Sequence, residues 1–210
     1  MLKGVIFDMD GLMIDTEKLL TRFWCEAANH YGYPMTKEHV LGIRSLAAKY
    51  AIPHLKGIFG EDFDYYKVRG KRIELMNEFI RQNGIEKKKK LDELLYYLDS
   101  TRLKKAVATA TDLQRTTLYL GSINIIDRFD KLICGNMIEN GKPAPDIYLA
   151  AAKELGLDPS ECIALEDSPN GIRSAHTAGC KPVMIPDLSQ PDEETKKLLY
   201  ACCDDLSKVI

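Results

Sequence analysis

The spacing of apolar residues predicts a strand and then a helix at the start of the chain. A short apolar run at residues 4–7 leads directly into the acidic loop Asp8-Met9-Asp10-Gly11. Over residues 16–31 the apolar side chains recur at helical spacing, and Gly32-Tyr33-Pro34 ends that pattern. A buried strand followed by an amphipathic helix is therefore expected here.

Two further helices, at residues 36–51 and 63–82, are predicted before any second strand. Pro53, Gly57 and Gly60 lie between them and are expected to interrupt helical structure. No convincing strand pattern occurs in this part of the chain. Residues 16–84 are therefore predicted to form a small all-helical unit.

After Gly84 the pattern changes to an alternation of helical segments and short apolar runs. The predicted helices are residues 91–98, 113–120, 147–155 and 172–178, and the apolar runs are residues 106–108, 132–134, 162–165 and 183–185. Strands that alternate with helices argue for a parallel sheet covered on both faces. The predicted fold class is therefore α/β, a doubly wound parallel sheet made by residues 1–15 and 85–210, with residues 16–84 inserted as a helical cap domain.

Composition and charge narrow the functional classes. The 210 residues include 29 basic and 31 acidic side chains, so the formal net charge is -2. No global field attracts nucleic acid or an anionic membrane, and an anionic ligand has to be held locally. No apolar run reaches spanning length and the first acidic residue comes too early for a secretory segment, so a cytoplasmic protein is expected. The sequence leaves the oligomeric state open, and a monomer is the simplest expectation. The six cysteines lack C-x-x-C spacing and are expected to be reduced thiols, mostly in the core.

Candidate chemistry follows the predicted strands, because ligands bind at the carboxyl ends of the strands in an open parallel sheet. Asp8 and Asp10 lie two residues apart after the first strand, so one carboxylate can attack while the other transfers a proton. After the second strand, the Thr109 hydroxyl and the free backbone N–H groups from Ala110 onward suit a phosphate. Asp112 is expected to cap the helix that follows.

Two later loops add a cation and two more carboxylates to the same predicted sheet edge. Two prolines stiffen the loop at residues 141–146 around Lys142, which is thereby presented as a fixed point charge. Glu166 and Asp167 follow the fourth strand, and Ser168-Pro169 provides good N-cap and N1 residues for the next helix.

These side chains form an oxygen-rich set that suits Mg2+ better than zinc, because histidines and thiolates are not clustered with them. A carboxylate that approaches a phosphate dianion at about 4 Å is repelled by roughly 8 kcal/mol at an effective dielectric constant of 20. Mg2+ together with Lys142 would offset that repulsion. Each segment alone also has a structural explanation: the acidic pairs as turn or helix-cap residues, Thr109 as a helix-boundary residue, and Lys142 as a solvated loop residue. The order and placement of all four together favour a catalytic site.

The four segments, in this order, resemble the motifs of the haloacid dehalogenase superfamily. They are Asp8-Met9-Asp10-Gly11, Thr109, the loop at residues 141–146, and residues 165–171. The helical insertion after the first motif is similar to that of the β-phosphoglucomutase-like and sugar-phosphate phosphatase branch. The resemblance covers essentially the whole chain and implies Mg2+-dependent phosphoryl transfer from a small phosphorylated metabolite.

The resemblance also implies a role for each matching residue. Asp8 would form an aspartyl-phosphate, and Asp10 would protonate the leaving oxygen and then activate water. The groups that would hold the transferred phosphoryl are Thr109, Ala110 and Lys142. The implied Mg2+ ligands are Asp8, Asp10 through its backbone carbonyl, Glu166 and Asp167.

Three positions bear on the substrate and on the branch of the superfamily. Mutases of this branch typically carry a histidine soon after the segment Asp15-Thr16, where this chain has Leu19-Leu20. Relatives also tend to have Pro-Gly where this chain has the four lysines at residues 87–90, which we interpret as a solvated face. Arg44 resembles an arginine that meets a second phosphate or another anionic part of the substrate. The alternative is that Arg44 is a solvated surface residue.

The leading hypothesis is therefore a phosphatase acting on a small phosphorylated metabolite, such as a sugar phosphate. The alternative enzyme is a β-phosphoglucomutase-like mutase, which would return the phosphoryl group to a sugar. The alternative of a different class is a phospho-acceptor signalling domain or a non-catalytic binding module. All four motif positions are filled, and a receiver domain needs neither the helical insertion nor Asp10, which favours an enzyme.

Overall fold

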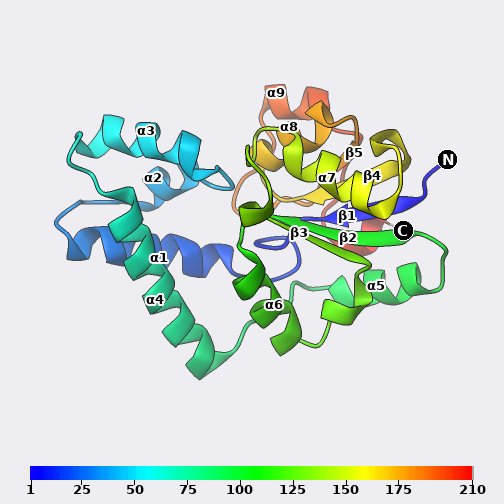
Figure 1. Cartoon of the computed structure of the whole chain (residues 1–210), viewed down its shortest axis with the longest axis horizontal. Helices are drawn as coiled ribbons and strands as arrows, with labels where there is room; N and C mark the ends of the chain where they lie inside the picture. Colours follow the sequence, from blue (N-terminus) through cyan, green and yellow to red (C-terminus); the bar gives the residue numbers. More distant parts are fainter. Residues whose placement is uncertain (210) are drawn as a thin grey trace.

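A six-stranded parallel sheet forms the centre of the molecule, in a computed structural model that describes residues 1–209 (Figure 1). The strand order is β3-β2-β1-β4-β5-β6, and every paired neighbour is parallel. The strands are β1 Gly4–Phe7, β2 Lys104–Thr109, β3 Lys131–Cys134, β4 Cys162–Glu166, β5 Lys181–Met184 and β6 Ala201–Cys202. The predicted α/β fold class is confirmed.

Helices cover both faces of this sheet, as Figure 1 shows. On one face lie α5 Leu91–Asp99 and α6 Leu113–Ser122; on the other lie α7 Asp146–Leu155 and α8 Pro169–Thr177, with α9 Glu193–Leu198 packed on α8. Val5 and Phe7 of β1 belong to the apolar cluster under α5 and α6, whereas Ile6 belongs to the cluster under α7. Because successive side chains of β1 are buried on opposite faces of the sheet, all residues of this strand are apolar or glycine.

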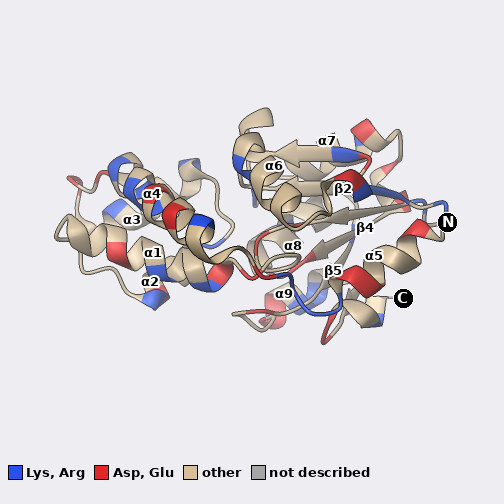
Figure 2. Ribbon diagram, turned by 90° about the horizontal axis from the view of Figure 1, so that it is seen from below, with Lys and Arg blue, Asp and Glu red and all other residues tan. Residues whose placement is uncertain are grey.

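The first four helices after β1 form a separate helical unit. They are α1 Glu17–His30, α2 Lys37–Gly42, α3 Ala48–Phe59 and α4 Tyr65–Asn83. Trp24, Leu55 and Phe63 belong to an apolar cluster confined to this unit, whereas Phe23 of α1 and Met76 of α4 join the cluster under α5 and α6. Figure 2 shows the helical unit to one side of the sheet, with basic and acidic residues mixed over both units. The domain boundaries at 15/16 and 84/85 stay a prediction.

The two segments that connect the units run side by side. The Asp15 N–H donates to Glu86 O at 2.9 Å, and the Lys88 N–H donates to Met13 O at 2.9 Å. Four short 3-10 turns complete the secondary structure, at Ile126–Arg128, Gly135–Met137, Pro159–Glu161 and Leu206–Val209. Within residues 1–209, no helix combines the length and the apolar character needed to cross a membrane.

The predicted helix at residues 36–51 is wrong at its C-terminal half. α2 ends at Gly42, the chain turns at Ser45, which has a φ of 57°, and α3 begins at Ala48. α3 then continues through Pro53, although proline removes one backbone hydrogen bond. Leu55 of the same helix is fully buried in the helical unit. Packing of the apolar face of α3 therefore outweighs the tendency of Pro53 to end a helix.

Two further features differ from the sequence-based expectations. Lys88 is not part of a solvated face, because its Nζ lies 3.0 Å from Asp15 Oδ1 and 2.7 Å from Asp187 Oδ1. The short elements α9 and β6 after residue 185 were not anticipated, since the sequence there has no extended apolar pattern. Three cysteines are buried as expected, whereas Cys202 is exposed.

Candidate active site

The predicted residues come together at the carboxyl edge of the sheet, where the helical unit faces it. Asp8 directly follows β1, Thr109 ends β2 and Glu166 ends β4. A cavity of about 570 Å³ lies there, and its lining includes Asp8, Asp10, Arg44, Thr109, Ala110 and Lys142. The expected helix caps are confirmed. Asp112 Oδ1 accepts from the Arg115 N–H at 3.0 Å, and Ser168 Oγ accepts from the Gly171 N–H at 3.1 Å.

Lys142 joins two of the carboxylates at the floor of this cavity. Its buried Nζ donates to Asp8 Oδ1, to Glu166 Oε1 at 2.6 Å and to Ala108 O at 3.1 Å. Burial disfavours the ammonium form, but the Asp8 and Glu166 carboxylates outweigh it, so the pKa of Lys142 lies above its ordinary value. The alternative of a solvated loop lysine is therefore wrong.

Negative charge is in excess around Lys142. Four carboxylates are buried here, from Asp8, Glu17, Glu166 and Asp167, against two buried cations, Lys142 and Arg44. Burial raises the pKa of Asp8 well above its ordinary value; Lys142 offsets this only in part, and the neighbouring carboxylates add to it. Burial also raises the pKa of Asp167 well above its ordinary value, despite Arg44. An added cation would favour the ionised form of these groups.

The residues present fit a divalent metal ion with a preference for oxygen ligands. One carboxylate oxygen each from Asp8, Glu166 and Asp167 lie within 4.8 Å of one another. Asp167 Oδ1 is buried and has no hydrogen-bond partner. Three carboxylates without histidine or thiolate suit Mg2+. The expected contribution of the Asp10 backbone carbonyl stays a prediction.

Asp10 is held by two hydroxyl groups. Thr16 Oγ1 donates to Asp10 Oδ1 at 2.6 Å, and Thr111 Oγ1 donates to Asp10 Oδ2 at 2.8 Å. Thr16 occupies the N-cap position of α1, yet its side chain makes no capping hydrogen bond. The Thr16 hydroxyl instead orients a carboxylate that belongs to the sheet unit.

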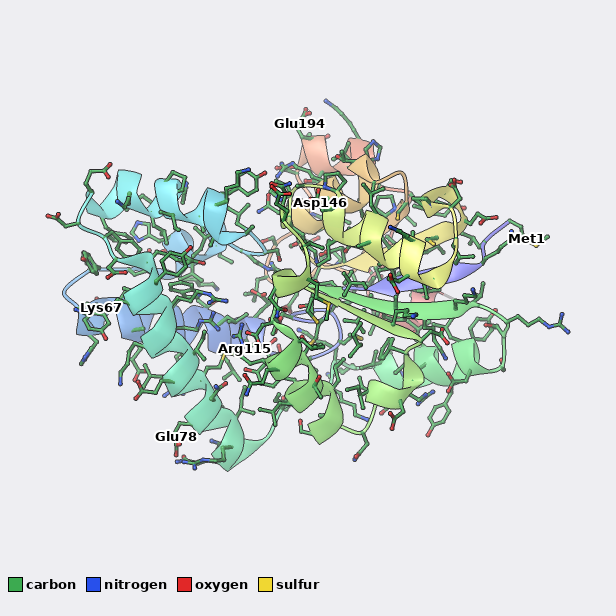
Figure 3. The ribbon with its side chains drawn as sticks, in the orientation of Figure 1. Met1, Lys67, Glu78, Arg115, Asp146 and Glu194 are labelled. Carbon is green, nitrogen blue, oxygen red and sulfur yellow. The ribbon has the colours of Figure 1, made fainter. Side chains whose placement is uncertain are left out.

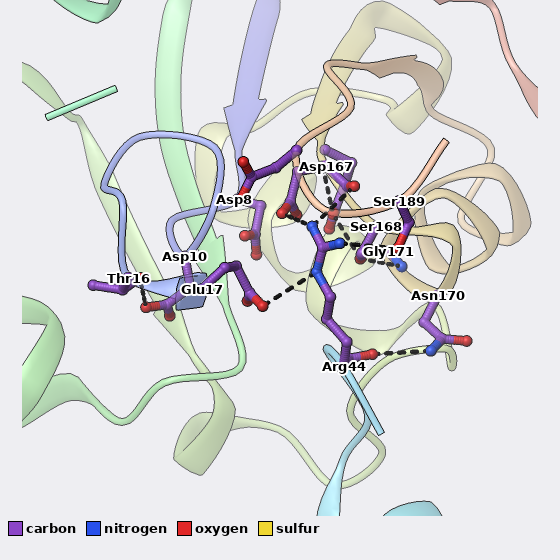
Figure 4. Close-up of polar contacts among 12 residues, drawn as sticks. Asp8, Asp10, Thr16, Glu17, Arg44, Asp167, Ser168, Asn170, Gly171 and Ser189 are labelled. Carbon is purple, nitrogen blue, oxygen red and sulfur yellow. Dashed lines mark hydrogen bonds and ion pairs between the residues drawn. The ribbon is translucent and has the colours of Figure 1, made fainter. Parts of the chain in front are cut away.

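Arg44 connects the helical unit to the floor of the site, as Figure 4 shows. Its Nη2 donates to Asp167 Oδ2 and, at 3.1 Å, to Asp167 O, while its Nε lies 3.2 Å from Glu17 Oε2. The residue is only 6% exposed, so the alternative of a solvated arginine is wrong. Nearby, the Ala47 N–H donates to Lys142 O at 3.0 Å. The helical unit is therefore closed over the sheet edge, and the predicted contact of Arg44 with substrate stays a prediction.

Comparison with known proteins decides the family. The family model described as haloacid dehalogenase-like hydrolase matches residues 5–185. The chain belongs to this family. The predicted membership of the haloacid dehalogenase superfamily, and with it the prediction of an enzyme, is confirmed.

Individual relatives of this haloacid dehalogenase-like chain include phosphatases. A phosphorylated carbohydrates phosphatase of Thermotoga maritima is 29% identical over 187 residues, which are 87% of this chain and 84% of that protein. A probable pseudouridine-5'-phosphatase of Drosophila melanogaster is 32% identical over 200 residues, 90% of this chain and 84% of that protein. The solved structure of a β-phosphoglucomutase from Clostridium difficile superimposes with a TM-score of 0.84 at 23% identity, covering 100% of this chain and 94% of that one.

Two residues of this haloacid dehalogenase-like site were missed by sequence reasoning. Glu17 is buried, and burial raises its pKa to about 8, with Arg44 lowering it in part. Tyr148 is also buried, and its hydroxyl donates to Glu166 Oε1 at 2.6 Å. The position of Glu17 next to Thr16 was a usable signal, but an acidic residue in a first helical turn is usually explained by the helix dipole.

The glycine of the first motif has a steric explanation in the structure. Gly11 has a φ of 88°, and a Cβ at this position would collide with the Asp167 carboxylate and lie 2.7 Å from Glu17 Cγ. A side chain would therefore strain the backbone and displace a carboxylate that fits the metal site. Gly11 allows the acidic loop to approach β4 this closely.

Proposed function

We propose that this chain is a Mg2+-dependent phosphatase that hydrolyses a small phosphorylated metabolite, such as a sugar phosphate, through an aspartyl-phosphate on Asp8. The observation that supports it most is the position of Asp8 at the floor of the cavity, bridged to Glu166 by the buried Lys142 ammonium. The names of the two phosphatase relatives support the same class of reaction.

In this proposal Asp8 is the nucleophile and Asp10 carries out both proton transfers. An Asp8 oxygen attacks phosphorus, the ester bond breaks, and the Asp10 carboxylic acid protonates the leaving alkoxide. Asp10 then accepts a proton from water, which attacks the phosphoryl group and releases inorganic phosphate and free Asp8. Thr16 and Thr111 keep the two Asp10 oxygens in place for both proton transfers.

Positive charge is needed to bring two anions together. Lys142, Thr109 and the N–H of Ala110 would hold the phosphoryl oxygens beside Asp8. Asp8, Glu166 and Asp167, with the Asp10 carbonyl, would hold Mg2+, which when bound supplies the charge that lets a carboxylate approach a phosphate. The closed helical unit would exclude bulk water from the cavity.

A mutase is the alternative enzyme, but α1 does not favour it. Leu19 and Leu20 stand where mutases of this branch carry a histidine, and Leu20 lines the cavity. An apolar side chain at this place cannot contact the acid/base carboxylate as a polar partner. The phosphatase is therefore the function that the site supports best.

Phosphate release from p-nitrophenyl phosphate tests the proposal. We expect turnover that requires Mg2+, is abolished by EDTA and falls at least about 1000-fold in Asp8→Asn. Asp127→Asn, the same change at an exposed position of the sheet unit, should keep wild-type activity. Full activity of Asp8→Asn would refute the nucleophile.

Two further outcomes identify the alternatives. Conversion of β-glucose 1-phosphate to glucose 6-phosphate that outpaces phosphate release would establish a mutase. Stable phosphorylation of Asp8 without release of phosphate would establish a phospho-acceptor domain.

A further inference from the structure

Three arginines line the cavity on the side formed by α4 and α6. Arg69 and Arg72 lie on the first half of α4, and Arg115 lies in the first turn of α6. Figure 3 shows Arg115 where α6 approaches the helical unit. The same cavity contains Asp8, so a ligand held at Asp8 shares one space with these arginines.

Arg72 is buried without an ionic partner. It is 5% exposed, its Nε has no hydrogen-bond partner, and its Nη1 has only the Met76 sulfur at 3.9 Å. Three arginines are buried among residues 1–209. Arg44 pairs with two carboxylates and Arg115 pairs with Asp112 at 2.7 Å, but Arg72 has no ion pair.

Repulsion adds to the cost of burying this guanidinium. Burial, followed by the positive charges of Arg115 and Arg69, lowers the pKa of Arg72 to about 10, which still leaves it protonated at neutral pH. The guanidinium lies 5.3 Å from the centre of the Trp24 ring. A cation–π contact is weaker than the desolvation penalty of an unpaired buried charge, so packing on Trp24 does not explain an arginine here.

We infer that Arg72, with Arg69 and Arg115, binds a second anionic group of the substrate, at the end remote from the phosphoryl group that Asp8 accepts. The inference rests on the proposed function and narrows the substrate class to phosphomonoesters that also carry a carboxylate or another phosphate. The cavity volume of about 570 Å³ suits a small metabolite of this kind. Charged guanidinium groups form strong hydrogen bonds with both types of anion.

Ligand binding to the catalytically inactive Asp8→Asn chain tests this inference separately from hydrolysis. Two matched pairs are compared by calorimetry with Mg2+ present: 6-phosphogluconate with glucitol 6-phosphate, and fructose 1,6-bisphosphate with fructose 1-phosphate. In at least one pair we expect the member with the second anion to bind about 10-fold more tightly, from one charge-assisted contact. Adding Arg72→Met, which keeps an apolar stem over Trp24, should reduce that preference to less than about 3-fold.

Two controls make the result specific. Arg81→Met changes an exposed arginine of the same helix and should leave the preference intact. If circular dichroism shows that Arg72→Met does not fold, Arg69→Gln, at a half-buried position, carries the test and should weaken the preference. Equal affinities within both pairs, or a preference that survives Arg72→Met or Arg69→Gln in a folded chain, overturns the inference. If the wild-type chain does not hydrolyse p-nitrophenyl phosphate, the proposed function itself is overturned.

Discussion

Replacement of Glu17 by glutamine is expected to stabilise the metal-free protein at neutral pH. Burial raises the pKa of Glu17 from an ordinary 4.5 to about 8, since the Arg44 charge compensates only in part. The folded protein therefore binds this proton more tightly than the unfolded chain does. The resulting stabilisation is fully present below pH 4.5 and is lost as the pH rises toward 8.

The size of this loss of stability follows from the difference between the pKa values of Glu17 in the unfolded and the folded protein. Between pH 4.5 and pH 7 the loss is about 3 kcal/mol, at about 1.4 kcal/mol for each pH unit. Glutamine has the shape of the protonated acid and cannot ionise, so the Glu17→Gln chain avoids this loss. It should also lose activity, because an amide then replaces the carboxyl group that contacts the Arg44 guanidinium beside the cavity.

Urea unfolding in EDTA at pH 4 and at pH 7 measures the effect. We expect the free energy of unfolding of Glu17→Gln to exceed that of the wild type by about 3 kcal/mol at pH 7 and to match it at pH 4. Glu26→Gln, on the exposed face of the same helix, should change it by less than about 0.5 kcal/mol at either pH. A Glu17→Gln chain that is less stable than the wild type at pH 7 would refute the reasoning, because the ion pair with Arg44 would then outweigh burial.

Three further substitutions test the contacts at the floor of the site. Lys142→Met leaves two buried carboxylates without their shared cation, so the free energy of unfolding in EDTA should fall by about 3 to 5 kcal/mol, and an unchanged urea midpoint would contradict this. Tyr148→Phe removes the hydroxyl bonded to Glu166, so the Mg2+ concentration for half-maximal activity should rise about 10-fold while kcat at saturating Mg2+ stays within about 3-fold. Thr111→Val frees one oxygen of Asp10, so kcat should fall about 10-fold with little change in KM; a KM effect alone would indicate a binding role.

The sheet and the principal candidate residues could be predicted because both depend on local sequence. A strand buried on both faces is an apolar run, and the residues that follow such runs meet at one edge whatever the strand order. Asp8, Thr109, Lys142 and Glu166 were placed together by this rule, and the structure brings them together.

The residues that could not be predicted depend on contacts between distant segments. Glu17 is an ordinary surface residue by sequence pattern, and Arg44 was named only through the family resemblance. The burial of both depends on the closure of the helical unit over the sheet. Lys88 was assigned to a solvated run because its partner Asp187 is far away in the chain. The continuation of α3 through Pro53 depends likewise on the apolar cluster of the helical unit, which outweighs a local signal.

Both sides of the cavity contain buried charged side chains. Near Asp8, four carboxylates face two cations; near Arg72, three arginines lie together and only Arg115 is paired. A fold selected for stability alone would replace these groups by apolar side chains, because unpaired buried charges are destabilising. The apolar clusters supply the main stabilisation of both units, which offsets the cost of these buried charges. The lining is therefore free to carry charges that a ligand completes, a cation beside Asp8 and an anion beside Arg72, and closure of the two units brings both sets into one space.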